Sequence, residues 1–89
     1  MDVQKAWDNL IIHEGEIFTT VSGLDFTYKM SEGKNSFKTS RTNYNLGRAN
    51  FEKAYKLMPA AANTKYLSDN GVRGQAYLFA ILTDSRIIG

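Results

Sequence analysis

The stretch Leu24-Asp25-Phe26-Thr27-Tyr28-Lys29-Met30 decides the fold. Its apolar and polar residues alternate, and successive side chains of a β-strand point to opposite faces of a sheet. The stretch therefore predicts a strand with one face in the core and the other in solvent. The residues expected to face the core are Leu24, Phe26, Tyr28 and Met30.

Two shorter runs on either side of this stretch predict further strands. Residues 16–22 are rich in β-branched and aromatic residues, and residues 36–42 alternate less regularly. The pattern of the third strand leaves its buried face open; if Phe37 faces the core, Lys38 and Ser40 lie on the outer face. The turn at Ser22-Gly23 and the polar segment 31–35 favour short connections, which make consecutive strands antiparallel.

The N-terminal segment predicts a helix that ends near His13. Asp2 can cap its first turn, and apolar residues from Val3 to Ile11 recur at helical spacing. We expect Trp7, on this apolar face, to be a core residue whose indole N–H finds an acceptor.

The second half of the chain predicts further helices. One begins at Asn45 or, because Gly47 is a poor helix former, at Arg48 or Ala49, and ends before Pro59. Residues 60–67 are expected to form a short helix or an ordered loop, and residues 74–83 a final helix. The apolar residues Ile87 and Ile88 are expected to pack against the fold.

Together these elements predict an α+β fold in one compact domain, residues 1–89. An N-terminal helix precedes a three-stranded antiparallel meander, and two or three C-terminal helices pack on one face of the sheet. A chain of 89 residues is too short for two independent cores. The residues expected to be buried together are Trp7, Leu10, Phe26, Tyr28, Phe51, Ala54, Leu78 and Ile81.

The composition argues against several classes of function. There is no cysteine, which excludes disulfides and thiolate metal sites, and His13 is the single histidine. Gly33-Lys34 lacks the remaining residues of a phosphate-binding loop, and no recognised hydrolase motif occurs. We therefore expect no enzyme, no cofactor and no metal. Without a leader-like start or a long apolar run, we expect a cytoplasmic location and no membrane partner.

The uneven distribution of charge gives a lead to function. Residues 32–56 hold six bases and two acids, and no acid lies between Lys34 and Arg48. Phosphates of DNA or RNA could be bound there by a basic hairpin face with hydroxyl donors nearby. The candidate nucleic-acid-binding residues are Lys29, Lys34, Lys38, Arg41 and Arg48. A solvated sheet face, which must be polar and in which lysine discourages edge pairing, explains the same pattern.

The alternative function is that of a protein-interaction module or homodimer. Its candidate surfaces are the edge strand 16–22 and the apolar residues not assigned to the core, which are Ile12, Phe18, Tyr44 and Tyr66. Segments 18–28 and 48–54 resemble stretches of small bacterial or mobile-element proteins. That likeness implies no activity and no site residue.

Overall fold

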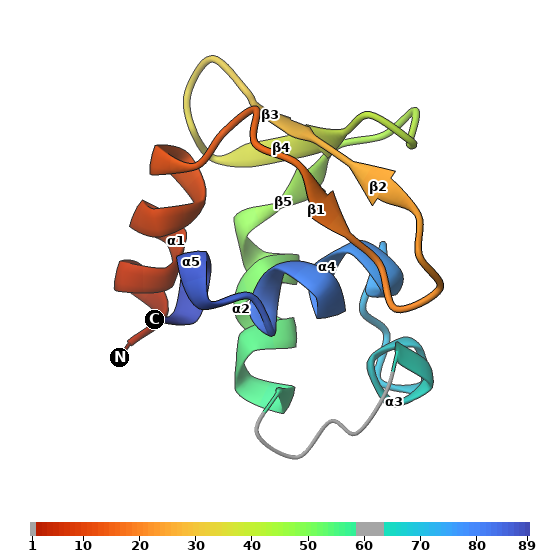
Figure 1. Cartoon of the computed structure of the whole chain (residues 1–89). Coiled ribbons are helices and arrows are strands. Elements are labelled where there is room, and N and C mark those ends of the chain that lie inside the picture. Colours follow the sequence, from red (N-terminus) through yellow and green to blue (C-terminus); the bar gives the residue numbers. More distant parts are fainter. Residues whose placement is uncertain (1, 59–63) are drawn as a thin grey trace.

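The computed structural model describes residues 2–58 and 64–89, and the predicted α+β fold is confirmed. Figure 1 shows the strands along one side of the molecule and most of the helices on the other. The elements, in chain order, are α1 (Val3–Ile12), β1 (Phe18–Thr19), β2 (Asp25–Phe26), β3 (Tyr28–Met30), β4 (Ser36–Thr39), β5 (Leu46–Gly47), α2 (Arg48–Leu57), α3 (Thr64–Asp69), α4 (Gln75–Leu82) and α5 (Ser85–Ile88).

The predicted central strand is divided into β2 and β3 by Thr27. β2 pairs with β1 in a two-stranded sheet, whereas β3 pairs with β4 in a three-stranded sheet of order β3-β4-β5. At the break, the Thr27 amide donates to the Ser40 hydroxyl over 3.1 Å instead of to a backbone carbonyl. All strand pairs are antiparallel, as expected, but the third strand of the larger sheet is β5, whose residues the sequence placed at the start of a helix.

The alternation predicted for residues 24–30 holds for three of its four apolar residues. Phe26, Tyr28 and Met30 are buried, but Leu24 is 47 % exposed, so its assignment to the core was wrong. The reason is that Leu24 lies beyond the last β1–β2 pair, in the turn, where its carbonyl accepts from the Thr20 amide. In β4, Phe37 is fully buried, which settles the register that the sequence left open.

A continuous chain of aromatic rings forms the centre of the core. The ring centroids of successive members lie 5.0–6.2 Å apart. This aromatic chain runs in the order Tyr77, Phe26, Phe18, Tyr28, Phe37, Trp7 and Phe51. It joins α4 to β2, β1, β3, β4, α1 and α2. All eight residues predicted to form the core are buried.

Two side-chain hydrogen bonds fasten α1 to the sheet beside the aromatic chain. The indole N–H of Trp7 donates to the Lys34 carbonyl over 3.2 Å, so the expected acceptor is present. The Tyr28 hydroxyl donates to the carbonyl of Leu10 over 2.6 Å in a buried position. These bonds satisfy polar atoms that the aromatic packing would otherwise leave without a partner.

The helix boundaries follow local signals. Asp2 caps α1 by accepting from the Lys5 amide over 2.8 Å, and α2 begins at Arg48, one of the predicted starts, with Gly47 left outside the helix. Gly74, with φ of 64°, precedes α4; a Cβ there would lie 2.8 Å from a methyl of Leu46, so only glycine lets α4 approach β5 this closely.

The remaining C-terminal predictions are met in part. Of the segment 60–67, residues from Thr64 onward form α3, and residues 60–63 lie outside the described residues. Ile87 is buried in the core as expected, whereas Ile88 is partly exposed. No helix in the described ranges 2–58 and 64–89 is long and apolar enough to cross a membrane.

The aromatic chain makes a direct prediction for stability. Replacing Phe26 by Ala removes the link between β1 and α4, and we expect it to lower the free energy of unfolding by about 3–5 kcal/mol. Leu24→Ala, two residues away on the same strand-like stretch but exposed, is the matched control and should change it by less than about 0.5 kcal/mol. Urea unfolding measures both; equal effects would show that the chain of rings is not the core's main support.

Candidate nucleic-acid interface

Two of the predicted basic residues, Lys29 and Lys38, lie directly opposite one another on the outer face of β3 and β4. Both side chains are exposed, because the alternate residues of the two strands face the core. Opposite residues of antiparallel strands have Cβ atoms about 4.5–5.5 Å apart, and like charges at this spacing repel. Within residues 2–58 and 64–89, no carboxylate lies within ion-pair distance of either lysine.

The lysine pair lies in an open hollow with a volume of about 620 Å³. We call it the lysine hollow, and it is lined by Glu14, Gly15, Thr27, Tyr28, Lys29, Lys38, Thr39 and Ser40. Of the lining residues with hydroxyl groups, Tyr28 and Thr39 are buried, whereas Thr27 and Ser40 are at least partly exposed. The Ser40 oxygen accepts from the Thr27 amide, and its own O–H remains able to donate.

The turn between α1 and β1 forms one rim of the lysine hollow. The Gly15 amide donates to the Tyr28 carbonyl over 3.2 Å, and Glu14 Oε2 accepts from the Met30 amide over 2.7 Å. These contacts cover the open edge of β3. The other oxygen of Glu14 lies 3.9 Å from Lys34 Nζ, so the positive charge of a third lysine balances the negative charge of this carboxylate.

The other predicted basic residues do not line the lysine hollow. Arg41 donates through Nε to the Asp25 carbonyl over 2.6 Å. Arg48 forms an ion pair with Glu52 at 2.9 Å, bonds to Gln4, and lies 5.5 Å over the Trp7 ring. Of the five candidates, the structure therefore brings Lys29 and Lys38 into one site, with Lys34 at its rim.

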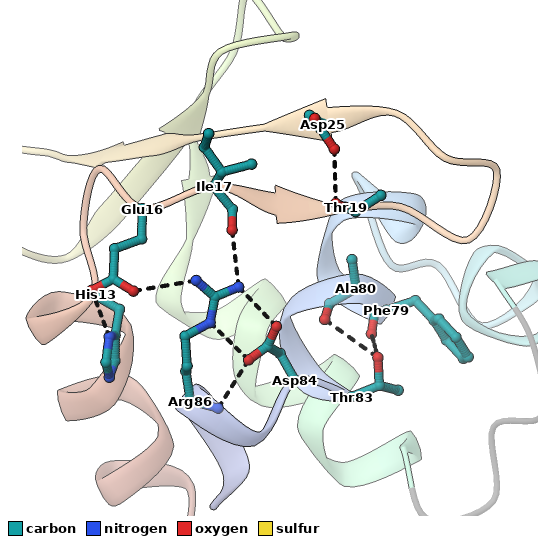
Figure 2. A network of polar contacts seen from close by, with 10 residues as sticks. All are labelled: His13, Glu16, Ile17, Thr19, Asp25, Phe79, Ala80, Thr83, Asp84 and Arg86. Carbon is teal, nitrogen blue, oxygen red and sulfur yellow. Dashed lines mark hydrogen bonds and ion pairs between the residues drawn. The ribbon is translucent and has the colours of Figure 1, made fainter.

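A cluster of titratable groups surrounds Arg86 of α5 (Figure 2). The guanidinium group bonds to both carboxylate oxygens of Asp84, at 3.0 and 2.9 Å, and to Glu16 at 3.2 Å. It also donates to the Ile17 carbonyl over 2.9 Å and lies 3.8 Å over the Phe18 ring. We call this the Arg86 cluster.

The Arg86 cluster serves the fold. His13, at the end of α1, bonds to the second oxygen of Glu16 at 2.8 Å, so α1, β1 and α5 are tied together. The nearby hydroxyl groups are used elsewhere: Thr19 donates to Asp25, and Thr83 donates to the Phe79 carbonyl of α4. Because Arg86 occupies the Ile17 carbonyl, part of the edge strand proposed for partner docking is already covered.

The Arg86 cluster holds its carboxyl groups in the ionised form. Hydrogen bonding to His13, followed by Arg86, lowers the pKa of Glu16, and hydrogen bonding to Arg86 lowers the pKa of Asp84. In the core, burial raises the pKa of the Tyr28 hydroxyl far above its ordinary value. Among residues 2–58 and 64–89, no three His, Asp or Glu side chains are grouped as metal ligands.

One further exposed contact, which was not predicted from the sequence, joins Tyr44 in the β4–β5 connection to Arg73 just before α4. The guanidinium carbon of Arg73 lies 4.6 Å from the centre of the Tyr44 ring. Nothing in the local sequence signals this contact, because the two residues are far apart along the chain.

Comparison with family models, with curated proteins and with solved structures finds no match to this chain.

The Arg86 cluster predicts how stability depends on acid. Because the pKa values of Glu16 and Asp84 are lower in the folded protein, their contribution is present above their ordinary values of 4.5 and 3.8 and is lost as the pH falls through the lowered values. In the Arg86→Gln variant, the melting temperature should fall less steeply than in the parent as the pH is lowered through this range. Lys5→Gln, exposed and outside the cluster, should leave it unchanged; parallel curves for the parent and Arg86→Gln would contradict the assignment.

Proposed function

We propose that this chain is a non-enzymatic binding module that holds the phosphate backbone of nucleic acid in the lysine hollow. The observation that carries the proposal is the pair of Lys29 and Lys38 on the open face of β3 and β4, which have no ion-pair partner in the part of the chain that the structure describes. A phosphate between the two ammonium groups would replace their repulsion by two attractive contacts.

The surroundings of the lysine pair support a phosphate ligand. The hydroxyl groups of Thr27 and Ser40 lie in the same hollow, and such groups commonly contact phosphate oxygens. Glu14 brings one negative charge to the rim, but Lys34 faces it, so Glu14 and the three lysines together leave the site with a net positive charge.

The protein-interaction alternative is supported by exposed apolar residues of the β1–β2 hairpin. Ile17, just before β1, is 61 % exposed, and Val21, in the turn with Leu24, is 75 % exposed. The apolar residues left unassigned by sequence do not add to this surface. Phe18 is buried, whereas Ile12, Tyr44 and Tyr66 belong to α1, the β4–β5 connection and α3, which lie apart in Figure 1.

Binding through the lysine hollow should be strongly dependent on salt. On duplex DNA, each neutralised phosphate contributes about 0.9 to the slope of log affinity against log salt concentration. The double variant Lys29→Gln/Lys38→Gln should weaken binding and reduce that slope by up to about 1.8. Its melting temperature should stay near that of the parent, because exposed charges contribute little to stability. Fluorescence anisotropy with labelled oligonucleotides over a salt series measures affinity and slope together.

The matched control is Lys5→Gln/Lys56→Gln, which removes the same charge from exposed positions on α1 and α2. It should keep most of the affinity and the slope. Equal losses of affinity in the two double variants would show that binding depends only on the net charge of the protein. Failure of the parent to bind any oligonucleotide in low salt would overturn the proposal and leave the hairpin surface, with a protein partner or a second copy, as the function to test.

A further inference from the structure

The contact between Tyr44 and Arg73 provides a second exposed feature near the proposed interface. Tyr44 is 38 % exposed, and Arg73 lies over its ring at 4.6 Å. Within the described ranges 2–58 and 64–89, Arg73 has no carboxylate within ion-pair distance. In these ranges no acid balances the charge of Arg73, so an aromatic ring and a planar cation lie together at the exposed surface.

The fold holds this pair in place. The side-chain amide of Asn50 donates to the Arg73 carbonyl and accepts from its amide, both over 2.9 Å. The next residue, Gly74, packs directly against Leu46 of β5. In the β4–β5 connection, the Thr42 hydroxyl donates to the Tyr44 carbonyl over 3.2 Å. Both partners are therefore positioned by hydrogen bonds of their own backbones before any ligand arrives.

The pair is within reach of a strand bound in the lysine hollow. Ser40 lines the hollow, and Tyr44 follows it by four positions, so their Cα atoms are at most about 14 Å apart. Proteins that bind single strands combine a basic groove for the backbone with aromatic side chains on which bases stack. Sites of this kind hold roughly 4–16 nucleotides, which is enough to cover the separation.

The shape of the lysine hollow favours a single strand over a duplex. Lys29 and Lys38 are exposed in an open hollow, and the α1–β1 turn forms a rim on one side of it through the contacts of Glu14 and Gly15 with β3. A two-stranded ribbon that reads a duplex must project into the major groove. A pair of lysines beside such a rim suits a flexible backbone that can bend past the rim.

We infer that the nucleic acid bound by this protein is single-stranded, with phosphates at Lys29 and Lys38 and a base stacked at the Tyr44–Arg73 pair. This inference rests on the proposed function, and it adds the class of ligand and a second contact point. Base stacking is indifferent to sequence because every base has a π-face, so the inference also implies little sequence preference.

The test compares a labelled oligothymidylate with a mixed-sequence duplex of the same length, by anisotropy in low salt. The parent should bind the single strand more tightly. Tyr44→Leu should weaken single-strand binding by roughly 5- to 100-fold and leave duplex binding and the salt slope unchanged, since it removes stacking and no charge. Tyr44→Phe, which keeps the ring, should bind as the parent does and shows that the loop still folds.

Tyr66→Leu is the matched control, because this tyrosine is exposed to nearly the same extent, 39 %, on α3. It should leave single-strand affinity unchanged. A parent that prefers duplex, or a Tyr44→Leu variant that binds oligothymidylate as the parent does, would overturn the inference while the proposed function stands. A parent that binds neither probe would overturn both.

Discussion

The contact of Tyr28 with Phe18 and Phe37 is the link on which the rest of the structure depends. Through it, the rings of the two-stranded sheet join those that pack on α1 and α2. The strands are only two to four residues long and would not persist on their own backbone hydrogen bonds. The buried aromatic side chains hold both small sheets against the helices.

This packing also determines what faces solvent. With Tyr28, Met30, Phe37 and Thr39 turned inward, the alternation of β3 and β4 leaves Lys29 and Lys38 no direction except outward, facing one another. Polar side chains cover two strand edges. Glu14 accepts from the Met30 amide of β3, and Arg86 donates to the Ile17 carbonyl beside β1. Glu14 and Arg86 thereby stabilise the fold, whereas within residues 2–58 and 64–89 neither lysine of the pair has an ion-pair partner.

The sequence predicted the parts of this structure that depend on short periods. Alternation identified Phe26, Tyr28 and Met30 as inward-facing, and helical spacing located Trp7, Phe51 and Leu78 in the core. It failed where the outcome depends on a distant segment. At the break, the Thr27 amide bonds to the Ser40 hydroxyl, which lies thirteen positions away. Strand β5 is too short to show alternation, and it forms where Leu46 pairs with Phe37.

The candidate site was predictable to a similar extent. The outward lysines follow from alternation, but their exact pairing follows from the hairpin register, which the sequence left open. Arg41 and Arg48 are near the two lysines along the chain but do not join them in the hollow. Arg41 bonds to the Asp25 carbonyl, and Arg48 forms an ion pair with Glu52. The bond between Arg86 and Glu16 spans 70 positions and leaves no local trace.

Backbone amide shifts of the isotopically labelled parent, followed by nuclear magnetic resonance during titration with an oligonucleotide, test the central claim most directly. That claim places the ligand on the outer face of β3 and β4. The account predicts that the largest shifts occur at Gly15, Thr27, Lys29, Lys38 and Ser40. Shifts confined to the β1–β2 hairpin, at Ile17 and Val21, or spread evenly over all exposed amides, would contradict it.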